Sequence, residues 1–122
     1  MAKKILVVDD ESEIASLVQY GLETAGYEVS TCENGRQVIE MLEKVRPDLL
    51  ILDVMLPGVD GFSLQTKISQ DKAFKNLPVI ILSALEPSRT LFQKFSQVVA
   101  FLTKPFNKDE LLAVVNKTLD NK

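Results

Sequence analysis

Five short strand-like runs recur along the chain, and three of them end at residues that can carry chemistry. The runs cover residues 5–8, 28–32, 49–52, 79–82 and 98–102. Most are continuously apolar, as expected of strands covered on both faces. The carboxyl ends of parallel strands meet at one crevice. Such a sheet would bring Asp9 and Asp10, Asp53 and Lys104 together although they lie far apart in the sequence.

Helical patterns alternate with these runs. An apolar stripe at helical spacing predicts a helix over residues 14–22, and Gly26 is a stop signal. Further helices are predicted over residues 34–45, 62–68, 87–95 and 107–119, with a polar loop over residues 70–77. Two pairs match capping boxes, Asn34 with Gln37 and Asn107 with Glu110. Five βα units with short connections predict an α/β fold, with a parallel sheet and helices on both faces.

Composition supports one domain and excludes several classes of partner. The 122 residues suit a single domain, 1–122. A net charge of -3 gives no support for direct nucleic-acid binding, which needs clustered Lys and Arg. The first apolar run is too short for a signal peptide or a membrane span, so no membrane partner is expected. Cys32 is alone, which fits a reducing cytoplasm, and we expect it to pack as a small hydrophobic side chain.

Histidine is absent from the sequence. The chain therefore has no Ser-His-Asp hydrolase site, no zinc site with histidine ligands, and no phosphohistidine of its own.

The two acids after the first strand give the first chemical signal. Like charges about 4 Å apart repel by roughly 4 kcal/mol at the effective dielectric of a protein surface, so clustered carboxylates favour a bound cation. Mg²⁺ takes a few carboxylate oxygens and keeps several waters, which suits this pair better than zinc would. The alternative is structural: Asp10 would cap the next helix, with Glu13 completing a capping box. The two roles are compatible.

Asp53 gives the sharper signal. It directly follows a fully apolar strand, where burying an unpaired charge is costly. An ionised aspartate beside a metal can attack a phosphoryl group and form an aspartyl phosphate. Lys104 offers a compact positive charge suited to phosphate, and the Ser83 hydroxyl can donate to a phosphoryl oxygen. Taken singly, a lysine is usually solvated and a serine can simply end a strand, so the coincidence at several strand ends is the stronger observation.

Five segments together resemble the receiver domain of bacterial two-component response regulators, the family of the chemotaxis protein CheY. They are residues 5–11 (ILVVDDE), 47–53 (PDLLILD), 55–61 (MLPGVDG), 78–84 (PVIILSA) and 103–106 (TKPF). The resemblance extends over essentially the whole chain. It implies a doubly wound, flavodoxin-like fold whose five-stranded parallel sheet has the order 2-1-3-4-5.

The resemblance also implies a role for each site residue. Asp53 would be the phosphoacceptor, and Ser83 and Lys104 would bind the phosphoryl group. Magnesium would be held by four groups: the carboxylates of Asp9, Asp10 and Asp53, and the backbone carbonyl of Met55. The Lys104–Pro105 peptide bond would be cis.

The implied partners are signalling proteins. A sensor histidine kinase or a histidine phosphotransfer protein would donate the phosphoryl group, and an effector protein of unknown identity would respond; a homodimer stays open. Phosphorylation adds roughly -1.5 to -2 charge. Ser83 and Phe101 would then move toward the site and remodel the face formed by the fourth helix, the fifth strand and the last helix. The chain would be a switch rather than an enzyme, assisting its own phosphotransfer and dephosphorylation.

The sequence departs from the family pattern in three places. Phe101 stands at the position of the family's switch aromatic and has no phenolic hydroxyl. Met55 and Leu85 occupy positions that tune access of water to the aspartyl phosphate, and their apolar side chains predict slow autodephosphorylation. No glycine precedes the fifth strand, so we expect a short, shifted or mobile fourth helix, with Phe92 and Phe95 in the core.

Three other functions share parts of this pattern. A haloacid-dehalogenase phosphatase also uses an aspartate nucleophile, magnesium and a lysine, but it has a second aspartate where this chain has Met55. An interaction module that needs no phosphorylation is disfavoured by the intact acids and Lys104. A flavodoxin-like cofactor protein is disfavoured because no loop rich in Ser, Thr and Gly follows the first strand.

Overall fold

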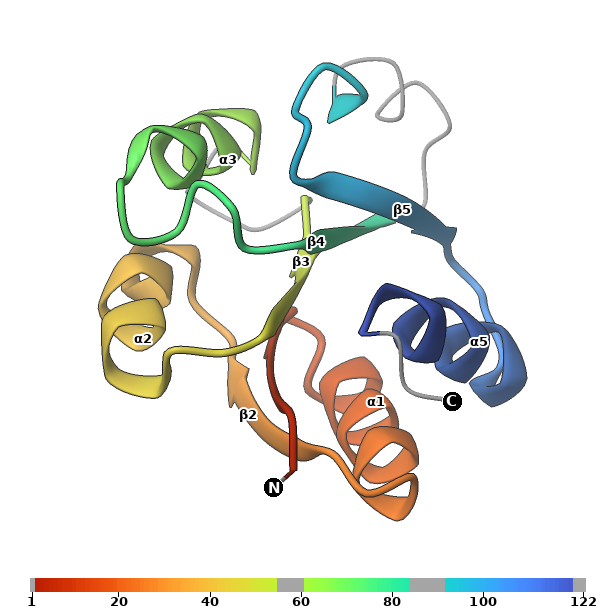
Figure 1. Ribbon diagram of the computed structural model, residues 1–122. Coiled ribbons are helices and arrows are strands. Elements are labelled where there is room, and N and C mark those ends of the chain that lie inside the picture. Colours follow the sequence, from red (N-terminus) through yellow and green to blue (C-terminus); the bar gives the residue numbers. More distant parts are fainter. Residues whose placement is uncertain (1, 55–60, 84–91, 120–122) are drawn as a thin grey trace.

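The protein forms one five-stranded parallel sheet (Figure 1). The computed structural model describes residues 2–54, 61–83 and 92–119. The strands are β1 (Lys4–Val8), β2 (Glu28–Cys32), β3 (Leu49–Asp53), β4 (Val79–Ser83) and β5 (Val98–Thr103). Their order is β2-β1-β3-β4-β5, and each neighbouring pair is parallel. The predicted sheet and strand order are confirmed.

Helices cover both faces of the sheet. They are α1 (Ser12–Thr24), α2 (Val38–Val45), α3 (Gly61–Gln70) and α5 (Lys108–Thr118), with a 3₁₀ turn, η1 (Gly35–Gln37), before α2. Figure 1 shows α1 and α5 on one face and α2 and α3 on the other. Most of the predicted fourth helix lies outside the described residues, and the described remainder, residues 92–97, consists largely of turns.

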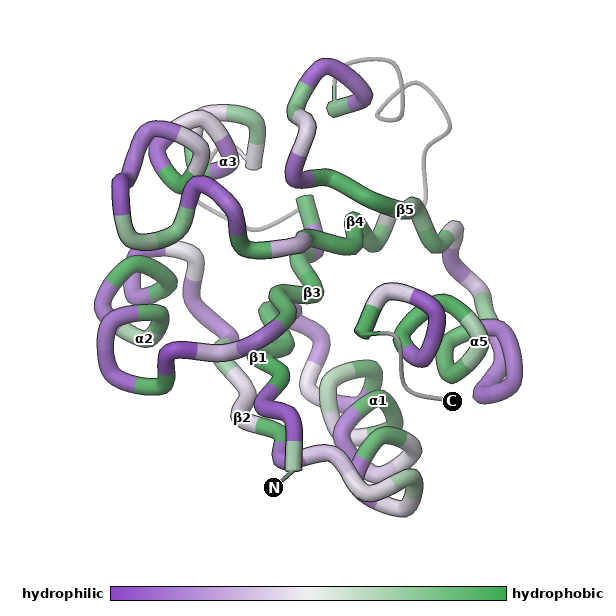
Figure 2. The backbone as a smooth tube through the Cα atoms, viewed as in Figure 1, coloured by the Kyte–Doolittle hydropathy of each residue, from purple (hydrophilic) through white to green (hydrophobic). Residues whose placement is uncertain are grey.

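Alternate residues of each central strand feed two separate cores. On β1, Leu6 and Val8 face the core under α2 and α3, whereas Ile5 and Val7 face the core under α1 and α5. All four side chains are fully buried, as the continuous apolar run predicts. Figure 2 shows hydrophobic residues concentrated in β1, β3, β4 and β5, with helices of mixed hydropathy around them. Phe92 and the partly buried Phe95 belong to the core on the α2 and α3 side, as expected.

The ends of the helices correct two details of the sequence interpretation. The Asn107 side chain accepts a hydrogen bond from the Glu110 N–H at 2.8 Å and caps α5 as predicted. Asn34 instead bonds the Arg36 N–H, at 2.9 Å, and opens a 3₁₀ turn rather than an α-helix. The capping role considered for Asp10 is wrong, because Glu11 occupies the N-cap position of α1 and makes no side-chain cap bond.

The segment between α3 and β4, predicted as a polar loop, contributes two apolar side chains to the core. It has no regular structure beyond turns, as predicted, but Phe74 and Leu77 are buried in the core on the α2 and α3 side. Cys32 is buried in the same core, and burial raises the pKa of its thiol, so the residue packs as a hydrophobic side chain.

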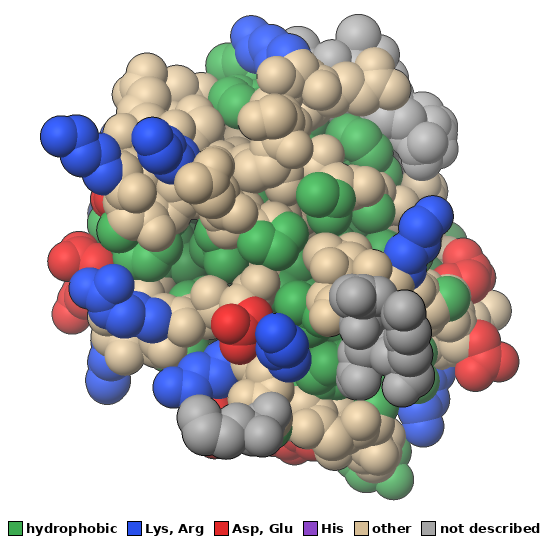
Figure 3. Space-filling view, viewed as in Figure 1, with side chains coloured by type: hydrophobic (Ala, Val, Ile, Leu, Met, Phe, Trp, Pro, Cys, Tyr) green, Lys and Arg blue, Asp and Glu red, His purple; other side chains and the backbone are tan. Residues whose placement is uncertain are grey.

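Charged side chains of both signs lie on the surface of the molecule. On the face in Figure 3, acidic and basic side chains are interspersed around the edge of the molecule. None of the described helices is both long enough and apolar enough to cross a membrane.

Candidate functional site

Three strand ends at one edge of the sheet bring the predicted acids and the lysine together. Asp9 directly follows β1, Asp53 is the last residue of β3, and Lys104 directly follows β5. Because β1 pairs with β3, the two strand ends lie side by side. Each of Asp9, Asp10 and Asp53 offers a carboxylate oxygen, and these oxygens lie within 4.8 Å of one another. Residues more than 40 positions apart thus form one acidic cluster.

Lys104 joins this cluster through its ammonium group. Its Nζ lies 3.0 Å from Asp9 Oδ2, 3.1 Å from Asp53 Oδ2 and 3.1 Å from Glu11 Oε1. Burial opposes the positive charge, but the three carboxylates outweigh it and raise the pKa of Lys104 above its ordinary value. The ammonium therefore stays charged at any physiological pH.

Asp9 has a pKa well above its ordinary value. Its side chain is fully buried, and this burial, with a contribution from nearby Asp53, raises its pKa to about 6. A hydrogen bond from the Glu11 N–H to Oδ1, at 2.9 Å, and the Lys104 ammonium act in the opposite direction. Oδ2 lies at ion-pair distance from Lys104, but it accepts no aligned hydrogen bond from the described residues.

The cluster has the chemistry of a site for a hard cation. Three carboxylates, those of Asp9, Glu11 and Asp53, contact the Lys104 ammonium. The Asp10 carboxylate lies beside those of Asp9 and Asp53, so negative charge remains uncompensated. The buried Asp9 Oδ2, without an aligned hydrogen bond, is a polar atom that a cation would satisfy. Oxygen ligands of this kind suit Mg²⁺. The residues present therefore fit a divalent cation.

Other predicted site residues are placed only in part. Ser83 ends β4, where its backbone pairs with Thr103 of β5, but its side chain lies outside the described part of the structure. Met55 and Leu85 lie outside the described residues altogether. Phe101 is half-buried and packs against the core on the α2 and α3 side. The Lys104–Pro105 peptide bond is cis, as expected.

Glu11 is the residue of the site to which the sequence interpretation gave no role. Its carboxylate accepts a hydrogen bond from Lys104 at 3.1 Å although its side chain is 60% exposed. The available signal was an acid directly after the pair Asp9 and Asp10. An exposed glutamate at a helix start is ordinarily a favourable charge near the helix dipole, so that signal was weak.

A parallel α/β sheet with clustered acids and a charged lysine at its carboxyl edge defines a class of site that handles a cation and an anionic group together. The response regulator receiver domain family matches residues 5–116 of the chain. The chain therefore belongs to the receiver domains of two-component response regulators. This assignment excludes the phosphatase and flavodoxin alternatives.

Individual relatives support the same family. The alkaline phosphatase synthesis transcriptional regulatory protein PhoP of Bacillus subtilis is 38% identical over 98% of this chain and 49% of its own length. The chain thus spans about half the length of this curated relative. Response regulator TrrA of Thermotoga maritima, solved with Mg²⁺ and beryllofluoride, is 35% identical with a TM-score of 0.84 over 95% of this chain and 98% of its own. The chemotaxis response regulator CheY4 of Vibrio cholerae is 29% identical with a TM-score of 0.89, over 97% and 99%.

Proposed function

We propose that Asp53 accepts a phosphoryl group while Asp9, Asp10 and Asp53 hold Mg²⁺. One observation carries this assignment: Asp53 Oδ2 receives a hydrogen bond from Lys104, at 3.1 Å, inside the acidic cluster. Asp9 differs from Asp53 in that its Oδ2 accepts no aligned hydrogen bond from Lys104, while its Oδ1 is bonded to the Glu11 N–H. The Met55 carbonyl would complete the metal ligands, and the Ser83 hydroxyl would bind a phosphoryl oxygen, as in the family.

The phosphoryl donor in this proposal is a phosphohistidine of another protein, a sensor histidine kinase or a histidine phosphotransfer protein. An Asp53 carboxylate oxygen attacks the phosphorus and forms a P–O bond. The P–N bond breaks, and its electron pair returns to the imidazole nitrogen, which takes a proton from water. Lys104 stays protonated and offsets charge on the transferred oxygens. A bound Mg²⁺ would supply further neutralisation of that charge.

The added charge is the signal. A phosphoryl group at Asp53 attracts Lys104 and the Ser83 hydroxyl, and the family pattern moves Phe101 inward. The face formed by β5, α5 and the segment before β5 then changes for an effector protein or a second copy of the chain. We propose that residues 1–122 form one receiver domain that acts in the cytoplasm. The domain would be a switch rather than an enzyme, and it would assist its own phosphorylation and dephosphorylation.

Phosphorylation is tested by intact-mass analysis after incubation with acetyl phosphate and MgCl₂. We expect one added phosphate on the wild type, none with EDTA, and none on Asp53→Asn. Asp48→Asn is the matched control, because Asp48 lies at the other end of β3, where it accepts a hydrogen bond from the Lys4 N–H. Labelling of Asp53→Asn, or turnover of acetyl phosphate without a labelled protein, would refute the assignment.

Metal binding is tested separately by thermal unfolding. A ligand present at 100 times its Kd stabilises the folded state by about 2.7 kcal/mol, so MgCl₂ should raise the Tm of the wild type. Asp10→Asn should remove most of this shift because Asp10 belongs to the cluster. Asp109→Asn makes an equal charge change at an exposed position of α5 and should keep the shift. Equal shifts in both variants would place the metal elsewhere.

A further inference from the structure

Carboxylates crowd the Lys104 ammonium in this structure, and it donates aligned hydrogen bonds to Glu11 and Asp53. A lysine ammonium has three N–H donors. Three carboxylates surround it within 3.1 Å: Asp9, Glu11 and Asp53. A phosphoryl oxygen that approaches Lys104 therefore competes with these three carboxylates for the ammonium.

Glu11 is the partner that leaves at the lowest cost. The side chains of Asp9 and Asp53 are 0% and 3% exposed, so a carboxylate that lost Lys104 there would lose its positive partner without gaining water. The Glu11 side chain is 60% exposed, and water can replace Lys104 at once. Ion pairs of this exposed kind are weak.

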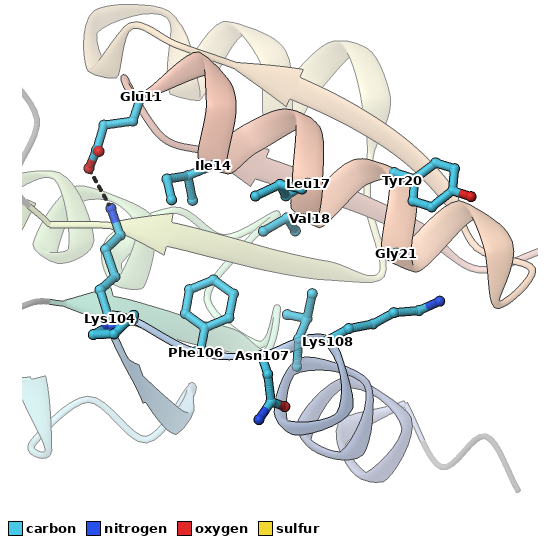
Figure 4. A pocket seen from close by; sticks show the side chains of 12 residues that line it. Glu11, Ile14, Leu17, Val18, Tyr20, Gly21, Lys104, Phe106, Asn107 and Lys108 are labelled. Carbon is cyan, nitrogen blue, oxygen red and sulfur yellow. Dashed lines mark hydrogen bonds and ion pairs between the residues drawn. The ribbon is translucent and has the colours of Figure 1, made fainter.

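The position of Glu11 allows it to hold Lys104 from outside the acidic cluster. Figure 4 shows Glu11 at the start of α1 and Lys104 at the end of β5, joined across one end of a groove of about 640 Å³ between α1 and α5. Asp53 lies on the inner side of the same ammonium. Lys104 thus stands between an exposed carboxylate and the phosphoacceptor.

We propose that Glu11 is a positioning residue that holds one N–H of Lys104 in the unphosphorylated protein and gives it up to the phosphoryl group on Asp53. The inference rests on the proposed function of Asp53. It follows that Glu11 competes with the phosphoryl group, so weakening the Glu11–Lys104 contact favours the phosphorylated state. Glu11 would set the balance of the switch without touching the transferred group.

The test measures beryllofluoride binding, a stable mimic of the phosphoryl group, by ¹⁹F NMR titration in saturating MgCl₂. Glu11→Gln should tighten binding about two- to fivefold, the range of an exposed ion pair. Glu11→Asp keeps the charge but shortens the side chain by one methylene, so it should tighten binding similarly. Glu13→Gln is the control: it makes the same charge change on the same helix, at an exposed residue with no ion pair to Lys104 among the described contacts.

Each outcome decides a different point. Tightening in both Glu11 variants but not in Glu13→Gln supports competition through the contact itself. Wild-type affinity in Glu11→Asp would mean that only the negative charge of residue 11 matters. Equal tightening in Glu13→Gln would mean that removing any nearby negative charge favours the anion through long-range electrostatics. Either result overturns the inference. Weaker binding in Glu11→Gln would show a merely supporting role and would also overturn it. If the wild type binds no beryllofluoride, the proposed function fails first.

Discussion

Burial and ion pairing act in opposite directions on the charged side chains at the carboxyl edge of the sheet. Asp9 is fully buried and its pKa is raised to about 6, mainly by burial, whereas the partly buried ammonium of Lys104 has its pKa raised by its carboxylate partners. The acid is thus poorly tolerated in its charged form, and the base is strongly held in its charged form. A site of this kind gains from a cation that compensates the remaining negative charge.

The pH dependence of stability should reveal Asp9. Its ordinary pKa is 3.8, so between pH 4 and 6 the folded protein binds a proton there that the unfolded chain has lost. Linkage then makes this residue's contribution to stability fall as pH rises, by roughly 2–3 kcal/mol in total. Asp9→Asn removes the effect. The unfolding free energy of the variant minus that of the wild type should therefore rise between pH 4 and pH 7.

Urea titrations at pH 4, 5.5 and 7 in EDTA provide the measurement. The comparison of two proteins cancels the other carboxylates, which titrate in both. Asp109→Asn, an exposed acid at the start of α5, should show no such rise. A flat difference for Asp9→Asn would mean that Asp9 is ionised in the folded protein at low pH, contrary to its burial.

At the scale of elements, the start of α3 lies directly against the end of β3. A Cβ built on Gly61 would lie 2.7 Å from the Val54 carbonyl oxygen and 2.8 Å from the Val54 Cα. Both obstacles are backbone, so they cannot move aside as a flexible side chain would. Because Val54 follows Asp53, this close approach fixes α3 beside the proposed phosphoacceptor.

Replacing two helical glycines should give opposite results. Gly61→Ala should lower the unfolding free energy by about 1–3 kcal/mol, because the added methyl group meets backbone. Gly21→Ala should raise it by about 0.5–1 kcal/mol, since its nearest neighbour outside α1 is the Lys108 side chain at 3.6 Å and alanine favours a helix. Urea unfolding measures both. Equal effects of the two substitutions would mean that the approach to Val54 is not a constraint.

A buried pair of glutamines ties the start of β5 to the segment after α3. Gln97 Nε2 donates to the carbonyls of Phe74 and Leu77 at 3.0 and 2.8 Å, and Gln97 Oε1 accepts from Gln65 at 2.9 Å. Gln97→Leu would leave these groups without their partner and should destabilise the protein by about 2–4 kcal/mol. Gln93→Leu, at an exposed position four residues earlier in the sequence, should change stability by less than about 0.5 kcal/mol. Chemical denaturation compares the two, and similar losses would contradict the role of the network.

The sequence predicted those elements whose pattern comes from burial alone. Continuous apolar runs indicated the central strands, and the strand ends indicated Asp9, Asp53 and Lys104, because parallel topology gathers those ends. It did not predict Gln65 and Gln97, since isolated glutamines are normally exposed and only tertiary contacts show that they are buried.

One irregularity of the sheet was equally hidden from the sequence. The register between β4 and β5 shifts after Val79, which pairs with Val98, because Ile80 pairs with Ala100. The skipped Val99 is 51% exposed. Its β-branched side chain reads as an ordinary strand residue, so sequence patterns could not locate a bulge that depends on how the edge strand pairs.

At the scale of the whole molecule, the two cores are separate in space but share the same strands. The core under α2 and α3 contains Leu42, and the core under α1 and α5 contains Tyr27, whose hydroxyl bonds the Asn116 side chain. Neighbouring residues of β1 and β3 contribute to opposite cores. If one core is lost, the shared strands lose their packing on that face, and the other core is weakened because it is built on the same strands.

This sharing predicts that damage on one face is felt on the other. Leu42→Ala should destabilise the protein by about 2–5 kcal/mol, because Leu42 is fully buried. Leu17→Ala, at a side chain 69% exposed on α1, should change stability by less than about 0.5 kcal/mol.

The tyrosines, Tyr20 and Tyr27, both lie on the α1 side of the sheet, so tyrosine fluorescence reports the face opposite to Leu42. In urea, the fluorescence midpoint of Leu42→Ala should fall together with that of far-ultraviolet circular dichroism, as one cooperative unit requires. A tyrosine transition that keeps the wild-type midpoint while the dichroism moves would show that the two faces unfold independently.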